Sequence, residues 1–463
     1  MAEKFRFAPT DVSQLADSYD LIVIGSGAAG LTSAIQAKEL GLTPIILEKM
    51  DKLGGNSTRA SSGMNAAETL VQLDHQVVDS YTEFYQETYV GGGKLNNTEL
   101  LKYFTEHAAL SIDWLAAHDI ELTDLTITGG MSKMRTHRPA SMAPIGAFLV
   151  TELLKQIKKL AIPLFAGTKV TELLTDSNGS ISGIEVVADG TPKTIHTKAV
   201  ILATGGFGAN QEMLVKYRPD LEGYKTTNQP GATGDGIELA EHIGAKVVDM
   251  NQIQVHPTVQ QDGPHAYLIG EAVRGEGAIL VNKSGQRFIN ELDTRKAVSE
   301  AIDNLNEGGA YLIFGQEIRD RVKAVEFYDS IGLVTTGQSV EELADKVGLD
   351  SESLVTTVSD WNAAVAAGAD SKLDRKTGME RGIQTGPFYA IHIAPAVHYT
   401  MGGVGINAET QVLRDDNSVI NGLYACGEIV GGLHGNNRIG GNSISETVIF
   451  GRQAGQQVYN YLA

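Results

Sequence analysis

The chain has 463 residues, and 37 Lys and Arg against 56 Asp and Glu leave a formal net charge of −19 at pH 7. A chain of this length exceeds what one hydrophobic core usually organises, so we expect two domains. The acidity argues against nucleic acid and anionic membrane surfaces as main partners. The single cysteine, Cys426, excludes an intramolecular disulfide and a cysteine-based metal cluster, and we expect no metal. No run of about twenty apolar residues predicts a membrane span, and no signal-peptide core is found, so we expect a cytoplasmic protein.

The first strong pattern is a strand, a glycine turn and a helix near the start of the chain. The apolar run Leu21–Ile24 predicts a buried strand, and glycines follow at G-x-G-x-x-G spacing before apolar residues recur at helical period. Such a turn lets the backbone approach a pyrophosphate, and the helix N-terminus offers free N–H groups. A second strand, Pro44–Leu47, leads to Glu48, whose carboxylate can accept hydrogen bonds from an adenosine ribose. We predict dinucleotide binding by Gly25, Gly27, Ala28, Ala29, Gly30, Glu48 and Lys49.

Two clusters of small residues after Glu48 predict a loop that runs under a long cofactor. An ordinary surface loop is the alternative. The candidate contacts are Gly54, Gly55, Asn56, Ser57, Ser62, Gly63 and Met64.

The next two hundred residues are expected to complete this domain. The expected elements are helices over 79–120, broken at 90–93, and over 146–160, and a meander of strands over 169–174, 181–187 and 194–197. A buried strand, 199–202, then ends in a glycine turn, which is a second approach of the backbone to the cofactor and favours FAD over NAD. The candidate contacts here are Val170, Thr204, Gly205, Gly206 and Asp235.

The middle and C-terminal parts differ in character. We expect a hairpin that joins 279–282 to 287–290, and then a polar, helical segment from about 300 to 370. The strand Val419–Ala425 predicts a return to the first domain, and a later glycine turn places the final helix so that its N-terminus faces a flavin ring edge. The candidate contacts are Gly427, Glu428, Asn442, Ser443 and Ile444.

Five basic residues stand in glycine-rich or strand-end settings in this acidic chain: His256, Arg274, Arg295, His398 and Arg438. If they meet in one cleft, they form an anion site, since Arg grips a carboxylate with two parallel N–H bonds. The alternative is that each is a satisfied structural histidine or an arginine on a solvated face.

Five motifs in order make the chain resemble the soluble fumarate reductase flavoproteins, relatives of the succinate dehydrogenase flavoprotein subunit. The motifs are HPT at 256–258, EAVRGEGAIL at 271–280, GQRFINELDTR at 285–295, HYTMGG at 398–403 and HGNNRIGGNS at 434–443. The resemblance implies an α/β fold, with a Rossmann-like FAD-binding domain (1–253 and 400–463) and an inserted α+β capping domain (254–399). It also implies an FAD-dependent reductase that converts fumarate to succinate. FAD is expected to be non-covalent, because no histidine lies in 56–62.

The resemblance assigns roles to particular residues. His398 and Arg438 are implied to bind one substrate carboxylate and His256 the other. Arg295 is implied to donate a proton, which reaches it through Glu271 and Arg274, while flavin N5 donates hydride. The chain lacks a haem-attachment motif and an added flavin domain, so electrons are expected from outside, from a reduced flavin or a partner reductase.

Two positions depart from the family pattern. Relatives usually carry Thr where this chain has Gly270, in the substrate site, and His where it has Tyr399. Because of these two residues, reduction of another 2-enoate, of the urocanate, acrylate or cinnamate type, is an alternative function. Further alternatives are a succinate or steroid-type dehydrogenase and a flavin-binding redox protein without turnover.

Overall fold

A six-stranded sheet organises the larger part of the computed structural model, which describes residues 5–140, 143–263 and 265–463. The strand order is β19 (Gln411–Leu413), β20 (Val419–Ala425), β10 (Ala199–Leu202), β1 (Leu21–Ile24), β2 (Pro44–Leu47) and β6 (Leu164–Phe165). All neighbours run parallel except β19 and β20. The inner strands are fully buried runs of aliphatic residues, as expected for a parallel sheet covered on both faces.

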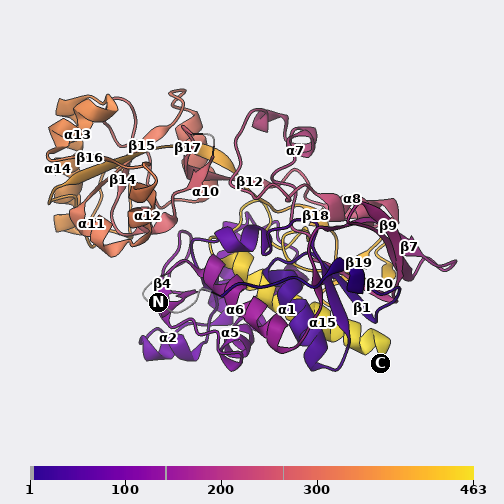
Figure 1. Cartoon of the computed structure of the whole chain (residues 1–463). Coiled ribbons are helices and arrows are strands. Elements are labelled where there is room, and N and C mark those ends of the chain that lie inside the picture. Colours follow the sequence, from indigo (N-terminus) through magenta and orange to yellow (C-terminus); the bar gives the residue numbers. More distant parts are fainter. Residues whose placement is uncertain (1–4, 141–142, 264) are drawn as a thin grey trace.

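Two helices pack together against this sheet. Helix α1 (Ala28–Glu39) lies beside α15 (Asn442–Leu462) in the centre of Figure 1. Glycines let the two backbones approach: a Cβ on Gly451 would meet the Ala29 carbonyl oxygen at 2.9 Å. The first and last parts of the chain therefore form one core.

The remaining elements around this core are short or lie at its edges. They are η1 (Val12–Gln14), η2 (Gly55–Arg59), α2 (Leu70–Asp74), α3 (Tyr81–Gly91), α4 (Thr98–Glu106), α5 (Ala108–Ala117), α6 (Ile145–Lys159), α7 (Gln211–Tyr217), η4 (Pro219–Leu221) and α8 (Asp235–His242). Three small sheets accompany them: β3 (Met64–Asn65), β5 (Thr136–Arg138) and β4 (Asp124–Thr126); β7 (Thr168–Thr175), β8 (Ile181–Ala188) and β9 (Thr191–His196); and β11 (Val247–Val248) with β18 (Gly403–Val404).

A second hydrophobic core lies in the orange lobe of Figure 1 and comprises buried residues between Ile269 and Ile393. Its sheet has the order β13 (Tyr267–Leu268), β12 (Ile253–Gln260), β17 (Phe388–Thr400), β15 (Ala310–Gly315) and β14 (Ile279–Val281), and β16 (Thr335–Gly337) also pairs with β17. Its helices are α9 (Glu271–Gly275), α10 (Arg295–Asp303), α11 (Gln316–Arg321), α12 (Ala324–Ser330), α13 (Val340–Val347) and α14 (Ser351–Ala367).

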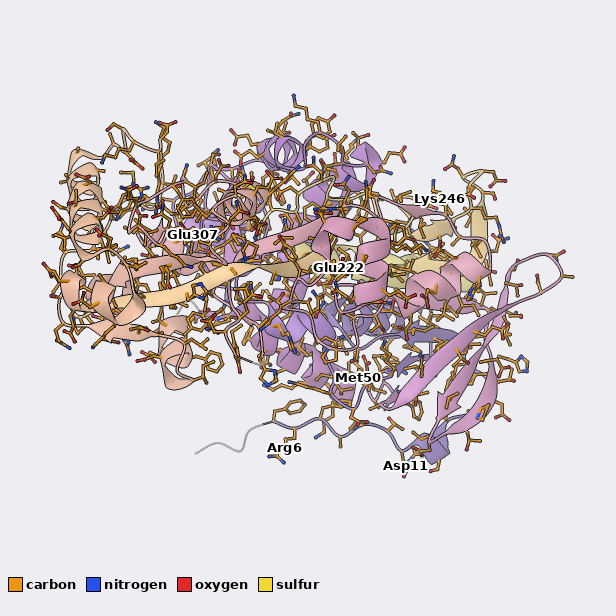
Figure 2. The ribbon with its side chains drawn as sticks, turned by 90° about the horizontal axis from the view of Figure 1, so that it is seen from above. Arg6, Asp11, Met50, Glu222, Lys246 and Glu307 are labelled. Atoms are coloured by element: carbon orange, nitrogen blue, oxygen red, sulfur yellow. The ribbon has the colours of Figure 1, made fainter. Side chains whose placement is uncertain are left out.

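The long strand β17 connects the two cores. Ile393 belongs to the second core, whereas Val397, four residues later, belongs to the first. Seen from above, Glu307 lies in the lobe of the second core, and Met50 and Lys246 lie in the other (Figure 2). Substrate-site candidates on β12 and β17 therefore stand where the two cores meet.

Several expected elements are wrong in detail. The strand at 279–281 pairs with β15, and only a single bridge, from Val281 to Arg287, remains of the expected hairpin. The segment 300–370 is not wholly helical, because β15 is a short buried apolar run whose length suits a strand. His256 lies inside β12 rather than at a strand end. Within the described residues, no helix has the length and apolar character needed to cross a bilayer.

Candidate flavin and substrate site

A cavity of about 780 Å³ opens at the carboxyl ends of the parallel strands β1, β2, β10 and β20. Each of these strands is followed by a loop that lines it: the glycine turn after β1, Glu48 after β2, Thr204 after β10 and Gly427 after β20. Ligands bind open α/β sheets in this position. The size is that of a site for a large organic cofactor.

The first glycine turn lines the cavity with bare backbone. Gly25 has φ +111°, and a Cβ there would lie 2.3 Å from the Ala203 carbonyl oxygen. A Cβ on Gly30 would lie 2.0 Å from the Gly25 carbonyl oxygen, so Gly30 serves the packing of α1 on the strand. The atom nearest to a Cβ built on Gly27 is Ser57 Oγ, at 3.6 Å. The space beside Gly27, the N-terminal cap of α1, is therefore open to a ligand.

Three hydrogen bonds hold the Glu48 carboxylate in place. The Ser26 N–H and hydroxyl donate to Oε2 at 3.0 and 2.6 Å, and the Met50 N–H donates to Oε1 at 2.9 Å. A carboxylate oxygen has further lone pairs, so the pre-oriented group remains able to accept hydrogen bonds from a ribose.

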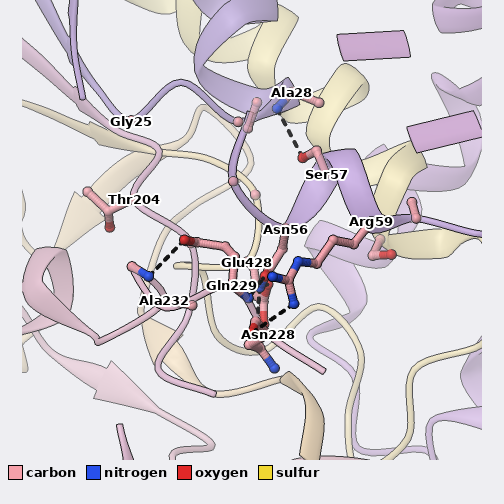
Figure 3. Close-up of a pocket in the computed structure, with 18 of the residues that line it drawn as sticks. Gly25, Ala28, Asn56, Ser57, Arg59, Thr204, Asn228, Gln229, Ala232 and Glu428 are labelled. Atoms are coloured by element: carbon pink, nitrogen blue, oxygen red, sulfur yellow. Dashed lines mark hydrogen bonds between the residues drawn. The ribbon is translucent and has the colours of Figure 1, made fainter. Parts of the chain in front are cut away.

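A group of polar side chains gathers in another part of the cavity wall (Figure 3). Asn56 Nδ2 donates to Asn228 Oδ1 at 2.5 Å and to Glu428 Oε2 at 3.3 Å, and Arg59 Nη1 donates to the Thr227 carbonyl oxygen at 2.7 Å. Burial raises the pKa of the Glu428 carboxyl to about 7. This wall therefore offers a carboxyl group that is partly protonated near neutral pH.

The structure brings most of the expected cofactor contacts to this cavity. Those that line it are Gly25, Gly27, Ala28, Ala29, Glu48, Lys49, Gly55, Asn56, Ser57, Ser62, Val170, Thr204, Gly205, Asp235, Gly427, Glu428, Ser443 and Ile444. Those that stand behind the lining are Gly30, Gly54, Gly63, Met64, Gly206 and Asn442.

The glycines behind the lining have packing roles. A Cβ on Gly54 would lie 2.4 Å from the Thr58 methyl group, and one on Gly206 would lie 1.9 Å from Thr400 Oγ1. A Cβ on Gly63 would lie 2.2 Å from the His137 carbonyl oxygen, and the next residue, Met64, pairs with His137 in a sheet.

Sequence reasoning missed several lining groups. Ser26 stands inside the glycine motif and could have been noticed as a partner for Glu48. Arg59, Lys169 and the segment 226–229 also line the cavity, and no local pattern marks them, since they come from a short 3₁₀-helix, a strand and an irregular segment.

The second group of interest surrounds Arg295, at the start of α10. Arg295 Nε donates to Glu271 Oε1 at 2.6 Å, and its Nη1 donates to Gln254 Oε1 at 3.2 Å. The Thr128 hydroxyl donates to the other Glu271 oxygen at 3.0 Å. Burial raises the pKa of Glu271, but the charges of Arg295 and Arg274 outweigh it and bring the pKa to about 2. The Glu271 carboxylate therefore stays ionised beside Arg295.

Arg274 lies behind Glu271 and is fully buried. Its Nη2 is 3.8 Å from Glu271 Oε1, and its Nη1 donates to the Glu291 carbonyl oxygen at 2.6 Å. Burial lowers the pKa of Arg274 to about 10. Arg295 lines the cavity, and Glu271 and Arg274 continue the row from it toward the protein interior.

Arg438 reaches the same end of the cavity from the C-terminal segment. Its guanidinium carbon lies 4.6 Å from the centre of the Tyr399 ring, and its Nη1 donates to Ser443 Oγ at 3.3 Å. Its Nε is buried without a hydrogen-bond partner. Burial and the charge of Arg295 lower the pKa of Arg438 to about 10.

His256 and His398 meet with ring centres 5.2 Å apart. The Thr258 N–H donates to His256 Nδ1 at 3.2 Å, so the proton of the neutral ring lies on Nε2, which is buried without a partner. His398 Nδ1 lies 2.7 Å from Thr227 Oγ1. Burial, followed by the charge of Arg295, holds the pKa of both rings well below the usual value. Both rings are therefore neutral at pH 7.

Tyr399 belongs to a buried network that sequence reasoning did not find. Its hydroxyl donates to Glu446, and Glu446 Oε2 lies 2.8 Å from His434 Nε2. Burial and the negative charge of Glu446 raise the pKa of Tyr399 well above its usual value. The phenol thus remains a hydrogen-bond donor beneath Arg438. Among the described residues, no group of His, Cys, Asp and Glu is arranged to hold a metal ion.

The fold and the site define a class of protein: a flavoprotein that binds a dinucleotide at the end of a parallel sheet, with a basic pocket beside it. The bare glycine turn, the anchored Glu48 and the buried, unpartnered Thr204 hydroxyl all fit FAD. A family model described as "FAD binding domain" matches residues 20–444. The chain belongs to this family and, with the relatives below, to its fumarate reductase flavoproteins, and FAD is its cofactor.

Three relatives illustrate the similarity. The chain is 49% identical over 441 residues to the NADH:fumarate oxidoreductase of Klebsiella pneumoniae (strain 342), covering 95% of this chain and 47% of that protein. It is 41% identical over 448 residues to the fumarate reductase (cytochrome) of Shewanella frigidimarina, covering 96% and 78%. The open conformation of a flavocytochrome c3 fumarate reductase superposes with a TM-score of 0.82 at 37% identity, covering 97% of this chain and 79% of that one. The chain thus spans about half the length of the first relative.

Proposed function

We propose that this protein reduces an α,β-unsaturated dicarboxylate, with fumarate as the substrate and succinate as the product. One observation carries the proposal: in an acidic chain, Arg295, Arg438 and His398 all line the FAD cavity, and His256 is buried against His398, with ring centres 5.2 Å apart. His256 Nε2 and Arg438 Nε are buried without a hydrogen-bond partner in the described part of the chain, which suits a dianionic ligand. We also propose that residues 1–253 and 400–463 form the FAD-binding domain and 254–399 the capping domain, because the second core lies within the latter range.

The two carboxylates have different partners in this proposal. Arg438 and His398 bind one, since both line the cavity. His256 binds the other through its Nε2–H, which has no partner in the protein. Neutral histidines suit this role because they donate a hydrogen bond without the cost of burying a further charge.

Bound FAD in its reduced form supplies hydride. The protein supplies the proton: Arg295 gives it to the second alkene carbon, and the alkene gains one hydride and one proton in all. Guanidinium normally holds its proton, so Arg295 must be reprotonated at once. Glu271 Oε1, 2.6 Å from Arg295 Nε, takes up a proton from the side of Arg274 and gives it to the neutral Arg295, which returns Glu271 to its ionised form.

The basic residues also stabilise the reaction electrostatically. Hydride addition builds negative charge on the carboxylate of the acceptor, as in an enolate. Fixed cations in a water-poor site stabilise such charge strongly, because they need no reorganisation during the reaction. Arg438 and Arg295 both line the cavity and are placed to do so. We propose that electrons reach the flavin from an external reduced flavin or a partner reductase.

Reduction of another 2-enoate is the second candidate, and Gly270 favours it. The three atoms nearest to a Cβ at this position belong to Ser61 and Tyr328 and lie at 3.5 Å or more, so there is room for a larger substituent. His256 favours a substrate with an acidic group on that side.

A panel of acceptors tests the proposal. The FAD-loaded protein is given reduced methyl viologen as electron donor, and fumarate, acrylate, urocanate and cinnamate are compared by kcat/KM. We expect fumarate to be reduced with the highest value. A higher value for one of the other acids would move the assignment to that acid, and no turnover with any of them would refute reductase function.

A further inference from the structure

Two hydroxyl groups that the roles above do not use flank Gly270: that of Ser61, which lines the cavity, and that of Tyr328, which stands behind the lining. Thr258, two residues after His256, exchanges hydrogen bonds with Ile269: the Ile269 N–H donates to the Thr258 carbonyl oxygen at 2.9 Å, and the Thr258 hydroxyl donates to the Ile269 carbonyl oxygen at 2.8 Å. These contacts place the next residue, Gly270, beside His256.

Gly270 is a bare position between two hydroxyls. The closest atoms to a Cβ built there are Ser61 Oγ at 3.5 Å and the Tyr328 hydroxyl at 3.6 Å. The Gly270 N–H donates to the Tyr328 hydroxyl at 3.1 Å, which fixes the phenol by its oxygen and leaves its proton free for another acceptor. Tyr328 is only 5% exposed.

Ser61 comes from the other side of the cleft. It follows η2 in the first core, whereas Tyr328 belongs to the second core. Arg138 Nη2 donates to the Ser61 carbonyl oxygen at 3.1 Å and anchors the backbone there. Ser61 lines the same cavity as Arg295, His398 and Arg438. In the described part of the chain, its hydroxyl has no hydrogen-bond partner among the protein groups.

We propose that Ser61 Oγ and the Tyr328 hydroxyl, around Gly270, bind the substrate carboxylate that lies next to His256. The proposal rests on the proposed function and adds to it the groups that distinguish a dicarboxylate from a monocarboxylate. A carboxylate at this point accepts one hydrogen bond from each core. A second acidic group on the substrate therefore holds the two sides of the cleft together.

Ser61→Ala tests the proposal, with fumarate compared against acrylate, which has no second carboxylate. Loss of one hydrogen bond to a charged group corresponds to about 10- to 100-fold in kcat/KM. We expect such a loss for fumarate, and a change of less than about threefold for acrylate. Ser61→Thr, which keeps the hydroxyl, is expected to retain most of the activity with fumarate. Tyr328→Phe is expected to act like Ser61→Ala, and Ser330→Ala on the same helix is the matched control.

Ligand binding without turnover provides a second measurement. Succinate is titrated into the oxidised, FAD-loaded protein, and the Kd is read from the change in flavin absorbance. We expect a higher Kd, and so weaker binding, in Ser61→Ala and an unchanged Kd in Ser330→Ala. Equal losses for fumarate and acrylate, or an unchanged succinate Kd, would overturn the role of Ser61. Absence of turnover in the unmutated protein would instead overturn the proposed function.

Discussion

At the scale of single residues, the site combines groups that are charged with groups that burial keeps neutral. Glu271 is ionised because two arginines face it, with its pKa at about 2. At Glu428, burial outweighs the hydrogen bonds from Thr400 and Asn56 and the charge of Arg438, and it raises the pKa to about 7. His256 and His398 are kept neutral by burial beside arginines. Glu271 and the two histidines therefore each have one protonation state at pH 7, whereas Glu428 titrates near that pH.

Glu428 is expected to make the stability of the cofactor-free protein depend on pH. Below pH 4.5, its carboxyl is protonated in both the folded and the unfolded protein. Between pH 4.5 and 7, the unfolded protein releases this proton while the folded protein keeps it, so the free energy of unfolding falls as the pH rises.

Glu428→Gln removes this dependence. We therefore expect the stability of the unmutated protein, relative to the variant, to be highest near pH 4.5 and to decline through pH 7. Urea denaturation at a series of pH values measures the difference. A difference that stays constant, or that grows as the pH rises, would contradict the expectation.

At the scale of elements, a buried ion cluster holds the second core together behind Arg274. Glu291 is 0% exposed and accepts from Arg287 Nε at 2.7 Å and from Arg375 Nη1 at 3.0 Å. Both guanidinium groups also lie on the faces of Trp361, with their carbons 4.5 and 4.6 Å from its ring centre. The cluster joins the segment before α10 to the segment after α14.

Glu291→Gln is expected to destabilise the second core by about 3 kcal/mol or more, because it leaves buried arginine charge uncompensated. Trp361 reports this core, and the chain has only one other tryptophan, Trp114, in the first core. Urea unfolding is therefore followed by tryptophan fluorescence in a Trp114→Phe background.

Asp374→Asn is the control for Glu291→Gln, because Asp374 pairs with Lys376 on the surface, where its side chain is 80% exposed. We expect the control to stay within about 0.5 kcal/mol of its parent. An unchanged unfolding midpoint in Glu291→Gln would show that the cluster adds nothing to stability.

The sequence predicts the elements whose signals are local. The strand, turn and helix at residues 21–39 and the strand Val419–Ala425 follow from apolar runs and glycine spacing, and the structure confirms them. The hairpin expected at 279–290 is wrong because the partner of β14 is β15, and strand pairing depends on residues distant in the chain.

The candidate site shows the same limit. Lining residues in glycine motifs were predicted, because their spacing is local. Arg59 and the network of Tyr399, Glu446 and His434 were not, because their contacts join loops and helices far apart in sequence. Gly54 and Gly206 carry the same sequence signal as the lining glycines, but they serve packing.

At the scale of the whole molecule, the site is built between two cores. The first core supplies the sheet, the glycine turns and Arg438, and the second supplies Glu271 and Arg274. Arg295 begins α10, which packs against β12 at the junction. The chain has a net charge of −19, while Arg295 and Arg438 are buried at the site.

The whole molecule is expected to hold FAD without a covalent bond. No histidine lies in residues 56–62, and the Cys426 thiol that lines the cavity is kept protonated, because burial raises its pKa far above neutrality. Acid precipitation of the purified protein is therefore expected to release all the flavin into the supernatant. A yellow pellet that keeps its colour after washing would contradict this expectation.

The most direct test of the central claim follows the reoxidation of bound, reduced flavin in a stopped-flow instrument, with fumarate as the acceptor. In the unmutated protein, we expect fumarate to reoxidise the flavin. In Arg295→Ala, we expect the rate to fall by at least about 10³-fold, because the proton donor and a stabilising cation are both lost. Reoxidation by oxygen needs no such donor, so its rate should be unchanged in Arg295→Ala, and so should the amount of bound flavin. In the control Arg218→Ala, the rate of reoxidation by fumarate should also be unchanged. Fumarate-driven reoxidation at the same rate in Arg295→Ala would contradict the account.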